Sequence, residues 1–475
     1  MAIETGKVGS PGWWIQRLSS DLQDKQTRVR GLRNYLQGNP PLPEGAEGCR
    51  EAYRKFQALS RTNFAELVVE VVAERMIPTG FRTGAEGDDI DDAAARRIWN
   101  ANNLDIVAPD VHTDMLGLAD GYVMVGPPDR ETGVPVITHE DPTTIVTAHD
   151  PRRPQKIVAS LKVFRDDVTG RGFAYLNLPG QVFVATSDNV PETDYVPQVD
   201  VASWEWDTDL SKPLPEGFKD VIPVVRFANR RGLGEFEPHV DILDRINYVT
   251  LQRLVIIAMQ AYRQRATEGD LPEVDEDGNT INYAAIFQPG PGALWHLPEG
   301  VKLWESQITD VRPILDAAKD DIRDLAAVTR SPLPAFVPDG MNQTAEGAGT
   351  AKEGLIFKAG DRIRRASFGW NSVMSLAFRF AGDMERANIL DLETLWRPPE
   401  RLTLSERADA ASKAKDDYPW RSRMSEIWGE SPEAIARMEA ERVADALQTA
   451  ALAPPTAPAT TATAPAEVPD DADAA

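Results

Sequence analysis

The 475-residue sequence has little cysteine and no long apolar run. Its single cysteine, Cys49, excludes an internal disulfide and any metal site made of cysteines alone, so we expect folding in a reducing compartment. The longest apolar run, Leu254–Met259, is far shorter than the roughly 20 residues that cross a bilayer. No basic segment followed by an apolar stretch stands near Met1, so we expect a soluble, unsecreted protein with no membrane partner.

Positive charge is also scarce. The chain has 51 Lys and Arg against 74 Asp and Glu, for a formal net charge of −23. Binding nucleic acid by neutralising many phosphates needs an excess of Lys and Arg on the contact face, so the acidic balance argues against that mode. At roughly 150 residues per domain, the length predicts two to four structural units.

Catalytic signatures are missing as well. The sequence contains no phosphate-binding loop, no H-E-x-x-H or C-x-x-C motif and no G-x-S-x-G nucleophile elbow. His112 lies between two aspartates and His139 precedes Glu140, but two ligands do not specify a metal site, so we interpret both histidines as structural or surface residues. We expect a non-enzyme with no metal and no cofactor. The rival interpretation is a hydrolase built from scattered carboxylates with His112 or His139, which predicts a monomer or small oligomer.

Hydrophobic periodicity indicates an α+β protein. The first hundred residues have helical spacing, and from about Leu104 the period changes to two, which indicates an antiparallel meander. The expected strands are Tyr122–Val125, Val134–Thr138, Thr144–Thr147, Lys156–Phe164, Phe173–Leu178, Gln181–Thr186 and Val221–Phe227.

Two long helices are predicted on either side of a small β patch, at about His239–Arg265 and about Thr309–Thr329. The second helix has an apolar face. Roughly opposite that face lie Asp316, Asp320 and Asp324, and one flank carries Arg312, Lys319 and Arg323. On the residues alone, this acidic stripe is a solvated face, and the basic flank could pair with neighbours. Trp295 and Trp304 flank a β patch too small to bury them, which suggests burial against another subunit.

The C-terminal third is predicted to be mainly helical. A polar loop at Pro338–Thr350, long enough to be functional or disordered, precedes a long helix at about Lys352–Gly382. Two further helices follow, at about Ser405–Asp416 and Ser431–Thr449. From Ala451 the chain is rich in Ala, Pro and Thr, which is typical of a disordered tail.

Five segments, in this order, make the chain resemble the portal proteins of tailed bacteriophages, in particular those of long-tailed phages of actinobacteria. They are Tyr35–Pro43 (YLQGNPPLP), Val71–Arg82 (VVAERMIPTGFR), Val224–Arg230 (VVRFANR), Gly292–Gly300 (GALWHLPEG) and Ile322–Pro334 (IRDLAAVTRSPLP). Where such portals often have Gly-x-Ser-Glu before the first stem helix, this chain has Gly234-Glu235-Phe236-Glu237.

The resemblance implies a division of the chain into the parts of a portal subunit. The wing would span residues 1–235, helical over 1–103 and β-rich over 104–235. The remaining parts would be a first stem helix at 236–266, a clip at 267–306, a second stem helix at 307–330, a tunnel loop and long wing helix at 331–399, a crown at 400–450 and a disordered tail at 451–475.

The resemblance also implies a function. Such proteins form twelve-subunit rings at one capsid vertex of the virion, assembled in the host cytoplasm, through which double-stranded DNA enters and leaves. Implied partners are the terminase large subunit, a head-tail adaptor, and the major capsid and scaffold proteins. A minor capsid or adaptor protein is the alternative. In this frame Asp316, Asp320 and Asp324 would face the channel, Met341, Asn342, Gln343 and Thr344 would form the tunnel loop, and Arg312, Lys319, Arg323, Trp295 and Trp304 would contact the next subunit.

Overall fold

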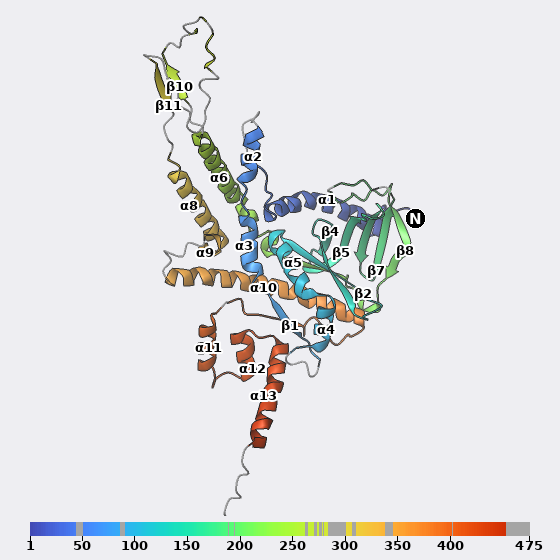
Figure 1. Ribbon diagram of the computed structural model, residues 1–475. Coiled ribbons are helices and arrows are strands. Elements are labelled where there is room, and N and C mark those ends of the chain that lie inside the picture. Colours follow the sequence, from blue (N-terminus) through green and yellow to red (C-terminus); the bar gives the residue numbers. More distant parts are fainter. Residues whose placement is uncertain are drawn as a thin grey trace, which may run out of the picture. The chain divides into compact units, whose positions relative to one another are not determined.

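A computed structural model describes most of the chain and divides it into two units, Met1–Glu406 and Arg407–Ala475. Helices and antiparallel sheets are mixed, so the α+β class is confirmed (Figure 1). Within the described residues, no helix combines the length and the apolar character needed to cross a membrane. Those residues are 1–43, 51–85, 91–188, 190–193, 195–261, 265–269, 273–274, 278, 280–283, 301–305, 310–337, 345–400 and 402–452.

A five-stranded antiparallel sheet is the first layer of unit 1, and its strands follow one another as a meander. Helix α1 (Pro11–Leu36) covers one face, because its apolar residues recur at helical spacing and meet the inward side chains of the sheet. Ser10 caps this helix by accepting a bond from the Trp13 amide, with Pro11 at the first helical position. The strands are β4 (Ile145–Asp150), β5 (Arg153–Arg165), β6 (Gly172–Leu178), β7 (Gln181–Ser187) and β8 (Glu205–Pro213).

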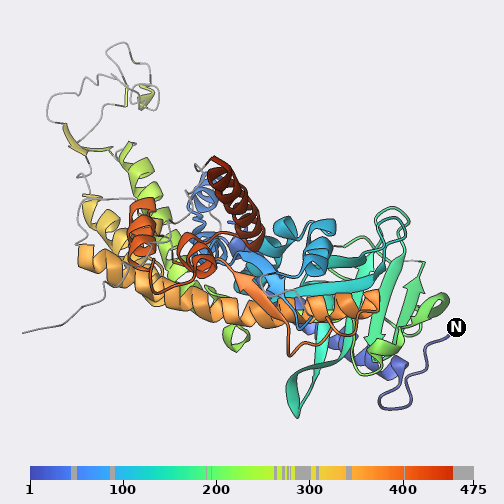
Figure 2. The ribbon, with the colours of Figure 1, turned by 90° about the horizontal axis from the view of Figure 1, so that it is seen from below.

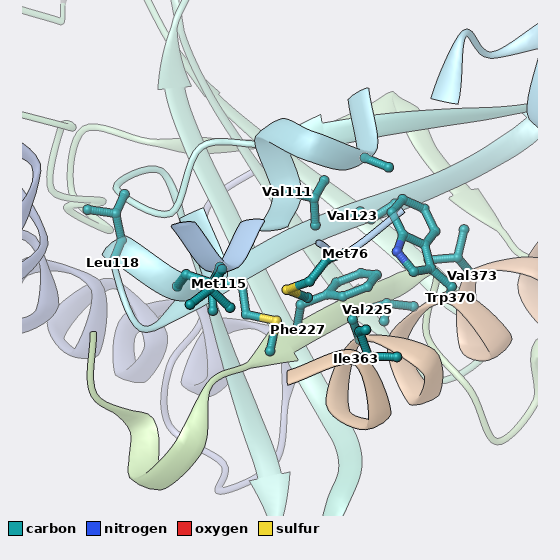
Figure 3. Close-up of a cluster of buried hydrophobic side chains, with 14 of the residues drawn as sticks. Met76, Val111, Met115, Leu118, Val123, Val225, Phe227, Ile363, Trp370 and Val373 are labelled. Carbon is teal, nitrogen blue, oxygen red and sulfur yellow. The ribbon is translucent and has the colours of Figure 1, made fainter. Parts of the chain in front are cut away.

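A second, three-stranded sheet carries the main core. Its order is β3 (Pro135–Glu140), β2 (Asp120–Pro128) and β9 (Val224–Ala228), all antiparallel. Helices α5 (Leu104–Gly117) and α10 (Ala345–Ala381) both contact it. Figure 3 shows Val123, Val225 and Phe227 from the sheet beside residues of both helices.

The long helix α10 crosses this sheet closely. A Cβ on Gly369 would lie 2.3 Å from Cε1 of Phe227, so only glycine allows the approach. Next to it, the fully buried Trp370 packs edge-on against Trp99 and Phe227, with ring centroids 5.1 and 5.0 Å apart. Figures 1 and 2 show α10 in orange beside the strands.

Helix α5 contradicts the expected β-rich region from residue 104. Leu104, Ala108, Val111 and Met115 are buried at spacings of four, three and four, which is the helical period. Pro109 within the helix obscured that pattern, since proline usually marks a break. The predicted strands from Tyr122 onward correspond to β2 to β7 and β9, although they divide between two sheets rather than one meander.

The two long helices predicted on either side of the small β patch are present. Helix α6 (Val240–Ala261) packs against α8 (Arg312–Thr329). The first was predicted to reach Arg265, which is wrong, because Arg265 opens strand β10 (Arg265–Glu268), paired antiparallel with β11 (Lys302–Glu305). Helix α10 begins at Ala345, so the loop predicted to extend to Thr350 is too long, and Ala345–Thr350 is helical.

Shorter elements complete unit 1. Strands β1 (Pro78–Arg82) and β12 (Glu393–Trp396) pair antiparallel with each other. They were not predicted, because both are short and β1 contains Pro78 and Gly80. The elements are α2 (Glu51–Leu59), α3 (Phe64–Ala73), β1 (Pro78–Arg82), α4 (Ala93–Ala101), α9 (Leu333–Phe336), β12 (Glu393–Trp396), and the 3-10 turns η1 (Glu216–Phe218), η2 (Arg230–Gly232) and η3 (Glu237–His239).

Unit 2 is helical, as predicted for residues after 400. The Ser431 hydroxyl accepts a bond from the Ala434 amide at 3.3 Å, which caps the last helix. Ala451 and Leu452 continue that helix, so the tail begins later than expected, and residues 453–475 lie outside the described part. The elements are α11 (Leu404–Lys413), which starts at the end of unit 1, α12 (Trp420–Ser422), the π-helical turn η4 (Arg423–Trp428) and α13 (Pro432–Leu452).

Candidate functional site

Helices α6 and α8 are the candidate site, and we call them the stem helices after the role that the sequence resemblance implies. Helices α6 and α8 lie side by side (Figure 1), and Arg245 of α6 links them across their shared edge. Its guanidinium forms ion pairs with Asp321 at 2.8 Å and Asp324 at 3.4 Å on α8. Asp321 is the more buried acid, at 14% side-chain exposure, and it was absent from the predicted set.

The three predicted acids lie on the exposed side of α8. Asp316, Asp320 and Asp324 are all exposed. Asp320 accepts a hydrogen bond from Arg323 at 2.7 Å within the same helix, and Asp324 is the residue that reaches Arg245. An acidic stripe is therefore present on one chain, with two of its three carboxylates partly balanced by arginines.

The basic flank is exposed too. Arg312 pairs with Asp310 at 3.5 Å and Arg323 with Asp320, so both arginines have acidic partners in their own chain. Lys319 is exposed and makes no ion pair with the described residues. Trp304 of β11 is 55% exposed. Trp295 and the predicted loop residues Met341, Asn342, Gln343 and Thr344 lie outside the described part of the chain.

The outer half of the stem buries little within a single chain. We call residues 252–258 of α6 and 312–324 of α8 the distal stem; it contains no buried side chain. Yet Leu254, Val255, Ile256 and Ile257 give α6 an apolar run there, with Ile257 50% exposed. Part of this apolar run is therefore exposed in the single chain.

The base of the stem is different, because it holds a buried cluster of charges that sequence analysis missed. Glu235 accepts from Lys358 Nζ at 2.9 Å and from Arg362 Nε at 2.6 Å, and all three side chains are less than 10% exposed. Asn229 donates to the same carboxylate at 3.0 Å. We call Asn229, Glu235, Lys358 and Arg362 the stem-base cluster.

Electrostatics keep this cluster charged. Burial raises the pKa of Glu235, but the ammonium of Lys358 and the guanidinium of Arg362 more than offset it, so that pKa lies below its ordinary value. Burial lowers the pKa of Lys358, and Glu235 opposes the change. Removing one partner of a buried ion pair lowers the free energy of unfolding by about 3–5 kcal/mol.

Further polar contacts hold the start of α6 to the rest of unit 1. The Arg28 guanidinium forms two hydrogen bonds with Glu237, at 2.6 and 2.7 Å. Tyr35 donates to Asp244 at 2.7 Å, and burial together with that carboxylate raises the pKa of the phenol. The first two turns of α6 are thus fixed, in contrast to the distal stem.

The two histidines of the hydrolase interpretation occupy separate surroundings. His112 is wholly buried, accepts a hydrogen bond from Trp370 Nε1 at 2.9 Å, and has a pKa lowered by burial to about 3, so it is neutral. His139 Nε2 lies 2.8 Å from Asp114. Among the described residues, no group of three or more His, Cys, Asp or Glu could hold a metal ion.

The chain is similar in sequence to the portal proteins of two phages. It is 27% identical over 430 residues to the portal protein of Mycobacterium phage D29, covering 86% of this chain and 83% of that protein. It is 28% identical over 378 residues to the portal protein of Mycobacterium phage L5, covering 75% and 73%. No protein-family profile matches the chain. The predicted resemblance to portal proteins is confirmed.

Solved structures give weaker likenesses. A chain from the neck of a native gene transfer agent particle, computed with C12 symmetry, matches with a TM-score of 0.42 and 10% identity, covering 83% of this chain and 98% of that one. A chain from the neck of an empty particle, computed with C6 symmetry, matches with a TM-score of 0.44 and 10% identity, covering 82% and 95%.

Proposed function

We propose that this chain is a portal protein, a subunit of a ring-shaped channel at one capsid vertex of a phage virion. The supporting observation is the similarity to two phage portal proteins over 75–86% of the chain, a span that must include most of the stem. In this role the ring admits double-stranded DNA during packaging, releases it at infection and joins head to tail. The protein acts by shape and charge and has no catalytic step.

The parts of the subunit follow the sequence-based division, adjusted to the observed elements. The wing is residues 1–235, with α5 added to its helical part, and the stem is α6 and α8. The clip is 267–306, of which β10 and β11 contribute described strands. The loop of Met341, Asn342, Gln343 and Thr344 leads directly into α10, the crown is 400–450, and the tail follows.

An acidic channel wall suits DNA that must slide. Phosphates repelled by carboxylates stay centred and mobile, whereas a basic wall would bind them. Asp316, Asp320 and Asp324 are exposed on one side of α8, and we assign them to the channel face. The loop residues before α10 would lie near the narrowest point, where polar side chains can touch DNA without holding it.

A ring needs a heterologous interface, in which one patch of each chain contacts a different patch of the next. The uncovered apolar run of the distal stem supports such a contact. We assign Arg312, Lys319 and Arg323 to this interface, together with Trp295 and Trp304. On assembly, Arg312 and Arg323 would leave their acidic partners in the same chain and pair with acids of the neighbouring chain.

The proposed location is the virion, at the portal vertex, after assembly in the host cytoplasm. The proposed partners are the other copies of the chain in a twelve-subunit ring, the terminase large subunit, a head-tail adaptor, and the major capsid and scaffold proteins.

The native mass tests the assembly. Mass photometry with negative-stain images of the purified protein should show a ring with a central hole, at about 630 kDa for twelve chains of 52.3 kDa. A stable species of one or two chains, even with scaffold protein added, would favour the adaptor or hydrolase alternatives.

Charge reversal tests the channel face. Replacing Asp316, Asp320 and Asp324 with lysine should slow DNA packaging while the ring stays intact, because the wall would then attract phosphates. The matched control reverses three exposed wing acids, Glu131, Asp167 and Asp209, and should leave packaging unchanged. Normal packaging by the stem variant would remove the channel assignment.

A further inference from the structure

Lys358 of α10 bonds to the segment that precedes α6 and to the last residue of α8. Its ammonium lies 2.9 Å from a carboxylate oxygen of Glu235, which precedes α6, and donates to the backbone carbonyl of Thr329 at 2.9 Å. Thr329 is the last residue of α8. Three elements that are far apart in the sequence therefore meet at one buried amine.

The carbonyl that Lys358 reaches needs a donor. The last four carbonyls of an α-helix have no partner within the helix, and together they carry a partial negative charge. Arg330 ends α8 in the left-handed conformation, and its amide bonds to Ala326 and Ala327. The amine of Lys358 satisfies the Thr329 carbonyl and opposes the negative end of the helix.

Arg362 provides an internal comparison, one helical turn further along α10. It pairs with the same carboxylate of Glu235 at 2.6 Å and with Asp361 at 2.5 Å, and its side chain is similarly buried. Within the described part of the chain, Arg362 makes no hydrogen bond or ion pair with α8. Both cations hold the base of α6, but the bond to the end of α8 belongs to Lys358.

Because Lys358 is buried, its amine depends on its protein partners. The side chain of Lys358 is 6% exposed, so water does not replace a lost partner easily. The amine is satisfied only when the base of α6 and the end of α8 both lie on α10. Other charged or titratable groups that face it are Arg330 and His239, and neither competes for the same two acceptors.

We propose that Lys358 is a positioning residue that fixes α8 to α10, so that the second stem helix and the long helix move as one body. The inference concerns one chain and does not depend on ring formation. Combined with the proposed function, it means that Lys358 sets the angle of the channel wall relative to the wing.

Distances between spin labels test the inference directly. In the full chain carrying Cys49→Ser, the exposed positions Ala317 of α8 and Arg364 of α10 are changed to cysteine and labelled. Labelled chains are diluted with unlabelled ones, so that double electron–electron resonance reports distances within a chain. Lys358→Met should broaden and shift the α8–α10 distance distribution, whereas Arg362→Met should leave it as in the parent.

A second variant keeps the test decisive if the single change prevents folding. Glu235→Gln/Lys358→Met removes both members of the ion pair, leaves Arg362 balanced by Asp361, and should show the same broadening. An unchanged distribution in whichever Lys358 variant folds would overturn the inference. Equal broadening in Arg362→Met would overturn it too, because the effect would then be a general loss of the cluster. A failed ring measurement would count against the portal function alone.

Discussion

The body of unit 1, by which we mean its two sheets and the helices packed on them, and the distal stem differ in how much of their side-chain surface they bury. In the body, Trp370 is fully buried and packs on Trp99 and Phe227, and His112 completes the contact with a hydrogen bond. In the distal stem no side chain is buried, although isoleucines and leucines recur along both helices. The body buries its apolar side chains within one chain, whereas the distal stem leaves Ile257 half exposed and buries no side chain fully.

Charges follow the same division. Two groups of charges in the body are shielded from water. One is the stem-base cluster, and the other is at Lys25, whose amine lies 4.0 Å from Asp120 and donates to Tyr122 at 2.9 Å. In the stem, Arg323 and Asp320 are more than 60% exposed. We therefore expect body charges to respond to pH and stem charges to respond to salt.

The largest expected effect comes from emptying the body core. Trp370→Ala should lower the free energy of unfolding of unit 1 by about 3–5 kcal/mol, since it leaves a cavity and strips His112 of its donor. Urea unfolding followed by circular dichroism measures the change. Phe368→Ala, two residues away and 49% exposed in the wild type, is the control and should cost far less. A similar decrease in the free energy of unfolding in the two variants would show that the buried core of the body does not dominate its stability.

The next effect is a pH dependence at Lys25. Burial lowers the pKa of Lys25 to about 8, with Asp120 opposing. The unfolded chain binds more protons than the folded one between that pKa and about 10.4, so this group makes stability rise as pH increases through the window. The rise should reach roughly 3 kcal/mol at most. Thermal unfolding of wild type and Lys25→Met at pH 7.5 and 10 measures it, and a wild-type advantage that fails to grow with pH would refute it.

A smaller effect is expected for the ion pairs that join the stem helices. Arg245→Ala should cost about 0.5–1 kcal/mol, because the guanidinium is half exposed and water screens its interactions. A double-mutant cycle with Asp321→Ala isolates the pair. The coupling energy between Arg245 and Asp321 should become smaller when the salt concentration rises from about 0.05 to about 0.5 M. A coupling energy that does not change with salt would show that this pair behaves like the buried ion pairs of the body.

The smallest effect on the stability of a single chain should come from a substitution in the distal stem. This substitution separates the stability of the chain from the assembly of the ring. Ile257→Ser should change the unfolding free energy of the dilute chain by less than about 0.5 kcal/mol, as for other exposed positions. The same change should weaken assembly, because the proposed ring buries this residue. Mass photometry over a concentration series gives the second readout, and assembly at wild-type concentrations would remove Ile257 from the interface.

Local pattern was enough to predict the amphipathic elements. Strands β5 to β7 were predictable because large apolar residues alternate along them, and α8 because its apolar residues recur at helical spacing. Strand β8 (Glu205–Pro213) was missed, since it is polar and lies at the sheet edge, where burial imposes no alternation. Pro109 hid α5 for the reason given above.

The stem-base cluster could not be predicted, because its members come from distant parts of the chain. Glu235 and Arg362 are separated by 127 positions, and no local rule pairs them. One signal was present: Lys358 and Arg362 lie on the same side of α10 as the buried Leu355 and Ala359. Two cations on an apolar helix face imply a buried anion somewhere in the fold, though not which one.

The glycine at the crossing of α10 over β9 has a mechanical consequence. Because Gly369 brings the helix axis close to the ring of Phe227, the crossing is a natural fulcrum for a stiff rod of 37 residues. Ala345 lies about 36 Å from this fulcrum and Lys358 about 16 Å, at 1.5 Å per residue. A tilt of about 5° would therefore displace the first turn of the helix by ~3 Å and the amine's attachment point by ~1.5 Å. In such a tilt, the base of the stem would move about half as far as the start of the helix.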